Sequence, residues 1–220
     1  MSDAWTPRPQ DKPWLSKADW LKRHEGFLAQ KRQNPDARVV LLGDSITDGW
    51  AGGGKAAWDR VLAPLGTLNF GIGGDEVQHV LWRVNSGELD GIAPKVVVVL
   101  IGTNNIGNVG HKAPEVARGV ELLLEAVRQK LPAAKVLLHA VFPRAEKPDA
   151  AFRLEIAELN RRIAPLADGR TVFWLDMTGR FVAPDGRIDK QTMPDFLHLS
   201  AASYERWADV LGPELERLLA

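Results

Sequence analysis

Two short segments of this chain carry the side chains that an acyl-transfer reaction needs. Ser45 follows Gly43 and Asp44 where a run of aliphatic residues ends, and His198 lies three residues after Asp195. A serine hydroxyl is a weak nucleophile unless a neighbouring base takes its proton, and a histidine base works best when a carboxylate orients its ring. We therefore predict that Ser45 is the nucleophile, His198 the base and Asp195 the orienting acid.

The same chemistry needs hydrogen-bond donors for the oxyanion that forms when a carbonyl is attacked, and each donor is worth on the order of 10²–10³ in rate. Gly74, within Gly71–Asp75, can offer an unshielded backbone N–H, and Asn104, within Gly102–Asn105, can offer a side-chain amide. The backbone N–H of Ser45 is a third candidate because it lies at the start of an expected helix. We predict an oxyanion hole made by these three donors.

The other serines and histidines have simpler explanations as structural residues. Helix caps, helix ends and an N-terminal arm account for Ser2, Ser16, Ser86, Ser200 and Ser203. Expected helices and one expected strand contain His24, His79 and His139. His111 lies in the loop after Asn104 and could reach a substrate, so it stays open as an alternative.

Asp176 competes with Asp195 for the role of the orienting acid. It ends the last expected strand, which is where α/β-hydrolases place this residue. That fold requires Gly-x-Ser-x-Gly around its nucleophile, and the second glycine is missing after Ser45. We therefore expect Asp176 to make hydrogen bonds in a turn.

Neither a metal nor a cofactor is expected. Asp44 and Asp75 flank the site segments and could be taken as a metal pair, but no further ligand completes the set, so we expect them to brace their loops. The glycines at 71–74 lack the spacing of a dinucleotide-binding loop, and those at 52–54 lack the residues of a phosphate loop.

These residues must be positioned by alternating strands and helices. We expect strands at residues 38–43, 67–70, 95–101, 135–142 and 171–175, and helices at 55–65, 77–86, 113–131, 149–166 and 201–219. Such alternation is typical of an α/β fold with a parallel sheet covered by helices on both faces. Ligands bind outside the carboxyl ends of such strands, which is where the candidate residues fall.

The chain is expected to form a single α/β domain at 38–220, preceded by an arm and a helix at 1–37 that pack on it. Prolines at 7, 9 and 13 block regular structure near the start, while Ser16 can cap a helix that ends near Asn34. Exposed tryptophan is rare in free tails, so Trp5 and Trp14 indicate that the arm lies against the domain.

Composition excludes several classes of protein. The 28 basic and 28 acidic residues balance, which argues against a nucleic-acid binder, and the absence of cysteine excludes thiol nucleophiles and disulfide scaffolds. The longest apolar run is too short to span a membrane. With no leader evident after Met1, we expect a cytoplasmic protein that acts on a small-molecule ester.

The motifs resemble, in order, the four blocks of the SGNH (GDSL) hydrolases. They are Gly43–Ser45, Gly74, Gly102–Asn104 and Asp195–His198, and the match extends over roughly 38–219. The chain is most similar to the branch of type I intracellular platelet-activating-factor acetylhydrolase catalytic subunits. The resemblance implies a three-layer, flavodoxin-like α/β/α fold with sheet order 2-1-3-4-5. It also implies the triad and oxyanion hole named above, and a homodimer.

The function expected from these features is a metal-independent serine esterase that removes short acyl groups, chiefly acetyl, through an acyl-enzyme. Ile46, Thr103 and Leu197 adjoin the catalytic segments, and their branched or bulky side chains could close an acyl pocket. The substrate would be an acetylated carbohydrate or an acetylated phospholipid. The alternative is a non-catalytic module that binds an acetyl or ester group on the same fold.

Overall fold

Five largely apolar segments form the strands of a parallel sheet in the computed structural model, which describes residues 3–220. The strands are β1 (Val39–Gly43), β2 (Thr67–Gly71), β3 (Val96–Leu100), β4 (Lys135–His139) and β5 (Val172–Leu175). Their order is β2-β1-β3-β4-β5, and every neighbouring pair is parallel. The predicted fold class and strand order are confirmed.

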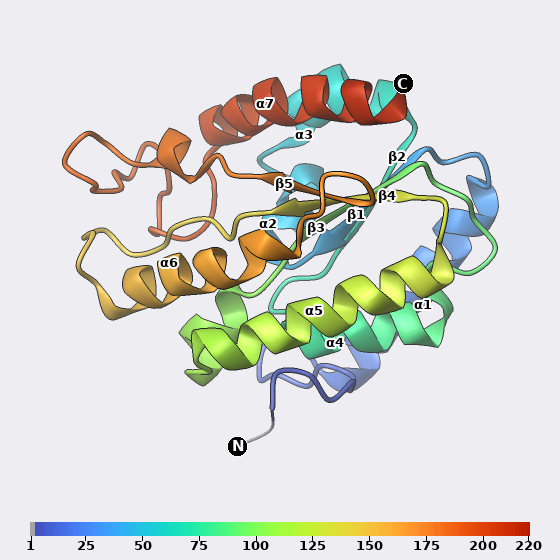
Figure 1. The fold of residues 1–220 in the computed structure, drawn as a ribbon, viewed down its shortest axis with the longest axis horizontal. Coiled ribbons are helices and arrows are strands. Elements are labelled where there is room, and N and C mark those ends of the chain that lie inside the picture. The colour runs from blue at the N-terminus through green and yellow to red at the C-terminus, as the bar shows by residue number, and fades with distance from the viewer. Residues whose placement is uncertain (1–2) are drawn as a thin grey trace.

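Helices cover both faces of this sheet, which gives three layers (Figure 1). Helices α3 (Lys55–Ala57) and α7 (Ala201–Leu219) lie on one face; α1 (Lys17–Gln33), α4 (Val77–Arg83), α5 (Ala113–Lys130) and α6 (Ala151–Ile163) lie on the other. The short α2 (Ser45–Asp48) follows β1 directly. Among the helices of residues 3–220, none combines the length and the apolar character needed to cross a membrane.

The apolar strand runs reflect burial on both sides of the sheet. Along β1, Val40 and Leu42 pack with α1, α4 and α5 in one core, whereas Val39 and Leu41 pack with α7 in the other. Every residue of β1 and β3 is buried. Strands of this kind read as unbroken hydrophobic runs because neither face meets water.

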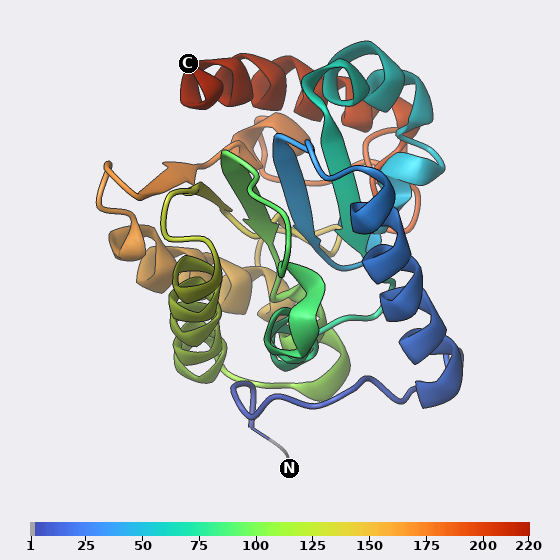
Figure 2. The same cartoon turned by 90° about the vertical axis from the view of Figure 1, so that its right-hand side faces the viewer.

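The N-terminal arm lies against α4 and α5 before the chain enters α1 (Figure 2). The carbonyl oxygen of Ala4 lies so close to Gly119 of α5 that a Cβ there would come within 2.4 Å of it. The side chain of Gln10 donates to the carbonyl of Gly73, and Lys12 pairs with the buried Glu76. The arm therefore reaches the loop that follows β2.

A buried ionic network joins that loop to the end of β1. The fully buried guanidinium of Arg83 donates to Asp75 at 3.0 Å, pairs with Glu88 and lies 3.4 Å from the carbonyl oxygen of Gly43. Trp20 of α1 donates to the other oxygen of Asp75 at 2.7 Å. As expected, Asp75 braces its loop through these hydrogen bonds. The single guanidinium of Arg83 contacts the carboxylates of both Asp75 and Glu88.

Gly71 allows α2 to pack directly on the end of β2. A Cβ at this position would lie 2.2 Å from the backbone nitrogen of Asp48. We expect Gly71→Ala to displace α2, which begins with Ser45, and to lower the free energy of unfolding by about 1–3 kcal/mol. Gly26→Ala is the matched control, because nothing lies within 4 Å of its Cβ position in α1, and it should be neutral or stabilising by up to about 1 kcal/mol. Urea unfolding measures both; equal effects would contradict the packing argument.

The buried network predicts a pH-dependent stability. Burial, only partly offset by Arg83, raises the pKa of Glu88 to about 7 and that of Asp75 to about 6. When folding raises the pKa of a carboxyl group, the free energy of unfolding falls as the pH rises from the unfolded pKa to the folded pKa. For Glu88 this range runs from about 4.5 to about 7. We expect Glu88→Gln to flatten the fall of Tm between pH 5 and pH 8. The exposed Glu125→Gln should keep the wild-type profile, and a Glu88→Gln profile parallel to wild type would contradict the prediction.

Candidate active site

The turn from β1 into α2 places Ser45 at the carboxyl edge of the sheet. A Cβ at Gly43 would lie 2.1 Å from Thr47 Oγ1 and 2.6 Å from the carbonyl oxygen of Leu100, so only glycine permits so tight a turn. Asp44 caps α2, since its carboxylate accepts the backbone N–H of Ile46 at 2.9 Å. Asp44 thus braces the turn, as the sequence predicted, and Ser45 is left facing outward.

His198 and Asp195 come from the loop before α7 and meet Ser45 there. Ser45 Oγ lies 2.9 Å from His198 Nε2, and His198 Nδ1 lies 2.6 Å from Asp195 Oδ2. The other oxygen of Asp195 accepts the backbone N–H groups of Leu197 at 3.1 Å and His198 at 2.7 Å. One carboxylate therefore orients the imidazole and shapes the loop that carries it.

The same loop contains a strained residue. Phe196, between the acid and the histidine, has a φ of 60°, a left-handed conformation that bulky residues rarely adopt. Its carbonyl accepts the N–H of Ala145, and its own N–H donates to Met193 at 2.9 Å. Backbone strain of this kind persists only where the surroundings enforce it, and it clusters at functional sites.

The loops after β2 and β3 place two of the predicted oxyanion donors beside Ser45. Gly74 has a φ of 82° in a turn closed by the N–H of Asp75 on the carbonyl of Ile72, at 3.1 Å. The amide of Asn104 donates to the carbonyl of Asp75 at 2.9 Å, and its oxygen accepts from Asn108 at 3.1 Å. These bonds fix the amide beside Gly74 and leave its second N–H hydrogen for another acceptor.

A cleft of about 460 Å³ opens over these groups. The residues predicted for catalysis and for the oxyanion hole that line it are Ser45, Gly74, Asn104 and His198. Of the three residues expected to close an acyl pocket, only Leu197 lies on its wall. Ile46 and Thr103 are buried and do not line the cleft. Ile46 packs in the core with Trp50, and the carbonyl oxygen of Thr103 accepts a hydrogen bond from Arg144.

Three further lining residues come from the N-terminal segment: Trp14, Leu15 and Arg23. Sequence reasoning assigned no role in the site to this segment. The one signal available was Trp14 in a proline-rich arm, and it indicated only that the arm packs on the domain.

Burial and hydrogen bonding set the charges around the site. Burial raises the pKa of Asp44 to about 7, although its hydrogen bond to Ile46 opposes the shift. Burial also acts to raise the pKa of Asp195, but hydrogen bonds from the side chain and backbone of His198 outweigh it and leave the pKa lowered. Asp195 therefore keeps its negative charge into mildly acidic solution.

The other histidines have the structural roles predicted for them. Burial lowers the pKa of His79 and of His139 to about 3, so both rings are neutral. His79 accepts the N–H of Glu76 at 3.0 Å, and His139 accepts the indole N–H of Trp207 at 3.2 Å. His111, the open alternative, is buried with its ring 3.3 Å from the amide of Asn105 and does not line the cleft.

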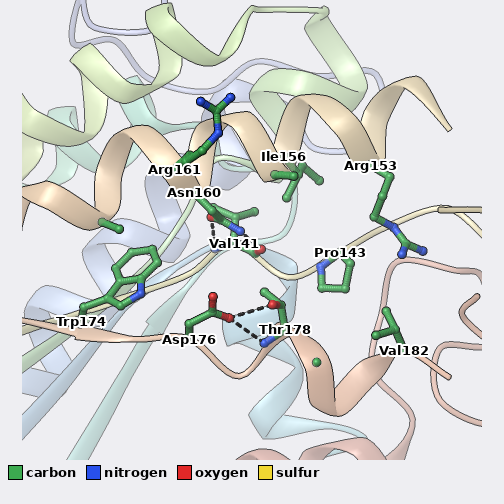
Figure 3. A pocket seen from close by; sticks show the side chains of 13 residues that line it. Val141, Pro143, Arg153, Ile156, Asn160, Arg161, Trp174, Asp176, Thr178 and Val182 are labelled. Atoms are coloured by element: carbon green, nitrogen blue, oxygen red, sulfur yellow. Dashed lines mark hydrogen bonds between the residues drawn. The ribbon is translucent and has the colours of Figure 1, made fainter. Parts of the chain in front are cut away.

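Asp176, the rival acid, lies in a different cavity between α6 and the segment after β5 (Figure 3). Its carboxylate accepts the backbone N–H of Thr178 at 2.9 Å and the hydroxyl at 2.7 Å. Trp174, Asn160 and Ile156 also line this second cavity, which contains none of the candidate catalytic residues. The prediction that Asp176 makes turn hydrogen bonds is confirmed.

Comparison with known sequences identifies the family. The model of the GDSL-like Lipase/Acylhydrolase family matches residues 41–206. The bovine platelet-activating factor acetylhydrolase IB subunit alpha1 is 38% identical over 205 residues, which cover 91% of this chain and 84% of the bovine protein. The human alpha2 subunit is 38% identical over 202 residues, covering 91% and 85% of the two chains.

Solved structures share the fold at lower identity. A GDSL-like lipase from Bacteroides thetaiotaomicron superposes with a TM-score of 0.74 at 21% identity and covers 88% of this chain and 97% of its own. Est24, a carbohydrate acetylesterase from Sinorhizobium meliloti, superposes with a TM-score of 0.64 at 20% identity. The match covers 82% of this chain and 98% of the Est24 chain. The chain therefore belongs to the GDSL-like lipase/acylhydrolase family and is a carboxylic ester hydrolase.

Proposed function

We propose that this esterase removes short acyl groups, chiefly acetyl, through a Ser45–His198–Asp195 triad. The observation that carries the proposal is the hydrogen-bonded chain from Ser45 Oγ to His198 Nε2, at 2.9 Å, and from His198 Nδ1 to Asp195, at 2.6 Å. In this mechanism Ser45 Oγ attacks the ester carbonyl while His198 Nε2 takes its proton. Asp195 holds the ring in the required tautomer and stabilises the imidazolium that forms.

The oxyanion of the tetrahedral intermediate would accept hydrogen bonds from the backbone N–H of Ser45, the backbone N–H of Gly74 and the side-chain amide of Asn104. The placement of all three residues on one cleft supports this assignment. When the intermediate collapses, His198 gives its proton to the departing alcohol oxygen and an acyl-serine remains. Water then attacks the acyl group while His198 Nε2 takes one of its protons. As the bond between the acyl carbon and Ser45 Oγ breaks, His198 gives that proton to Ser45 Oγ, and the carboxylic acid leaves.

The acyl group and the alcohol are proposed from different observations. Leu197 on the cleft wall supports a short acyl pocket, whereas Ile46 and Thr103 do not line the cleft. The names of the bovine relative and of Est24 refer to acetylhydrolase and acetylesterase activity, which supports acetyl as the group removed. An acetylated carbohydrate and an acetylated phospholipid are the two candidate substrate classes.

The triad assignment predicts how the enzyme responds to three substitutions. Ser45→Ala should abolish covalent labelling by a fluorophosphonate and hydrolysis of p-nitrophenyl acetate. Asp195→Asn should lower kcat by up to about 10⁴-fold, the loss that the equivalent change causes in a well-studied triad, because the ring then takes the wrong tautomer. Asp176→Asn is the matched control and should stay close to wild type.

Two outcomes would contradict the assignment. A loss in Asp176→Asn as large as that in Asp195→Asn would mean that the acid is wrong. If the wild-type protein is neither labelled nor active on p-nitrophenyl acetate, the esterase mechanism at Ser45 is wrong.

The acyl pocket predicts a change of chain-length preference. Leu197→Ala should raise the ratio of kcat/KM for p-nitrophenyl octanoate to that for p-nitrophenyl acetate by about tenfold. The shortened side chain leaves room for about two more methylenes of the longer acyl chain, and burial of each is worth about 0.8 kcal/mol. Val182→Ala shortens an apolar side chain in the second cavity and should leave the ratio unchanged. An unchanged ratio in Leu197→Ala would exclude this residue from the acyl pocket.

A further inference from the structure

The N-terminal arm holds an exposed tryptophan over the catalytic cleft. Trp14 is 64% exposed and lines the cleft together with Ser45 and His198. The chain has eight tryptophans, and the other seven are buried or half-buried. Single exposed apolar side chains are common, but this ring lines the cleft beside Ser45 and is therefore placed to stack on a bound ligand.

The turn that carries Trp14 is rigidly held. Lys12 and Leu15 exchange two backbone hydrogen bonds of 3.0 and 3.1 Å, so that Pro13 and Trp14 form the tip of a tight turn. Proline fixes its own φ and favours the position it takes here. The exposure of Trp14 therefore follows from a defined backbone.

Contacts on both sides of the turn fasten it to the body. The buried side chain of Gln10 donates to the carbonyl of Gly73 at 3.3 Å, and Lys12 pairs with the fully buried Glu76. After the turn, the first backbone N–H of α1, that of Lys17, donates to Asp11 at 3.1 Å. The backbone that carries Trp14 is thus held in place beside the cleft without a bound ligand.

That place is next to the proposed oxyanion hole. A Cβ on Gly74 would lie 3.2 Å from Trp14 Nε1 and 2.8 Å from Gln10 Oε1. The indole and Gly74 are therefore close enough that one small ester could place its carbonyl at Gly74 and its alcohol part against the indole. Because Leu197 comes from a different loop and is proposed to contact the acyl group, the arm is free to contact the alcohol.

The polar groups around Trp14 favour one kind of alcohol. Asp48, Arg23 and Asn108 line the same cleft, and Arg23 pairs with Asp48 at 2.7 Å. Among the described residues that line the cleft, Arg23 is the only lysine or arginine, and its charge is already matched. A phosphate would find no unpaired cation there, whereas a ring bearing hydroxyl groups would find both an aromatic face and hydrogen-bonding partners.

Resting on the esterase activity proposed above, we propose that the turn Lys12–Leu15 forms the alcohol subsite and that Trp14 stacks on the pyranose ring of an O-acetylated carbohydrate. The C–H bonds on the face of a pyranose carry a partial positive charge and match the negative face of the indole. Hydroxyl groups of the same ring would bond to Asp48 and Asn108. Trp14 is then a residue that determines specificity and takes no part in the proton transfers.

The test compares esters with and without a ring in the alcohol. Acetate release is measured by titration for wild type, Trp14→Ala and Trp14→Phe. The three esters are a mono-O-acetylated methyl xylopyranoside, which keeps two free hydroxyl groups, ethyl acetate, and a soluble short-alkyl 2-acetyl glycerophosphocholine. Trp14→Ala should lower kcat/KM for the sugar ester by about 10- to 100-fold and change that for ethyl acetate less than about twofold. Trp14→Phe should keep most of the sugar activity. Leu154→Ala, which removes an exposed apolar side chain on α6, should change none of the three rates.

Each other outcome overturns the inference in a distinguishable way. Equal losses on the sugar ester and on ethyl acetate would mean that Trp14 only supports the fold near Gly74. A loss confined to the phospholipid would assign the subsite to a lipid, and no loss on any ester would leave Trp14 outside the substrate site. If wild type is inactive on ethyl acetate and Ser45 is not labelled, the proposed function fails. If wild type is active on ethyl acetate and Trp14→Ala keeps the wild-type ratio of kcat/KM for the sugar ester to that for ethyl acetate, only the subsite is refuted.

Discussion

The candidate active site depends on one buried guanidinium. Arg83 touches the carboxylates of Asp75 and Glu88 and the carbonyl of Gly43, so it links the loop that carries Gly74 to the turn that carries Ser45. A buried charge is tolerated only when it is paired and hydrogen-bonded, and removing one partner leaves the others buried without compensation. Because the contacts of Arg83 specify one arrangement, the turn that carries Ser45 and the loop that carries Gly74 are fixed relative to each other.

The other two residues of the proposed triad reach this centre from the far end of the chain. His198 lies 153 residues after Ser45, in a loop whose shape is set by the carboxylate of Asp195. That loop includes Phe196 in a left-handed conformation, so its geometry is held at an energetic cost. Asp195 and His198 lie within one short turn, so local contacts set their relative position. Only the contact with Ser45 depends on the packing of α7 on the sheet.

The N-terminal arm adds a layer that the sheet and helices do not provide. It crosses α4 and α5, inserts Gln10 and Lys12 beside the loop after β2, and then enters α1, whose Trp20 donates to Asp75. The arm is thus connected to the same buried carboxylate that Arg83 binds. The candidate active site and the cleft wall beside it therefore share contacts, which shape the cleft in the absence of a ligand.

The sequence alone determined the strand and helix order and the residues that meet at the carboxyl edge of the sheet. Apolar runs and helical spacing are local patterns, and the ends of parallel strands must converge, so Ser45, Gly74 and Asn104 could be predicted to lie together. The side-chain directions of Ile46 and Thr103 and the reach of Trp14 were decided only by the tertiary structure. Ile46 points into the core because α2 packs on β2, and Trp14 reaches the cleft because Gln10 and Lys12 contact residues 63 and 64 positions away. Contacts over such separations leave no periodic signal in the chain, since they depend on how the whole sheet is covered.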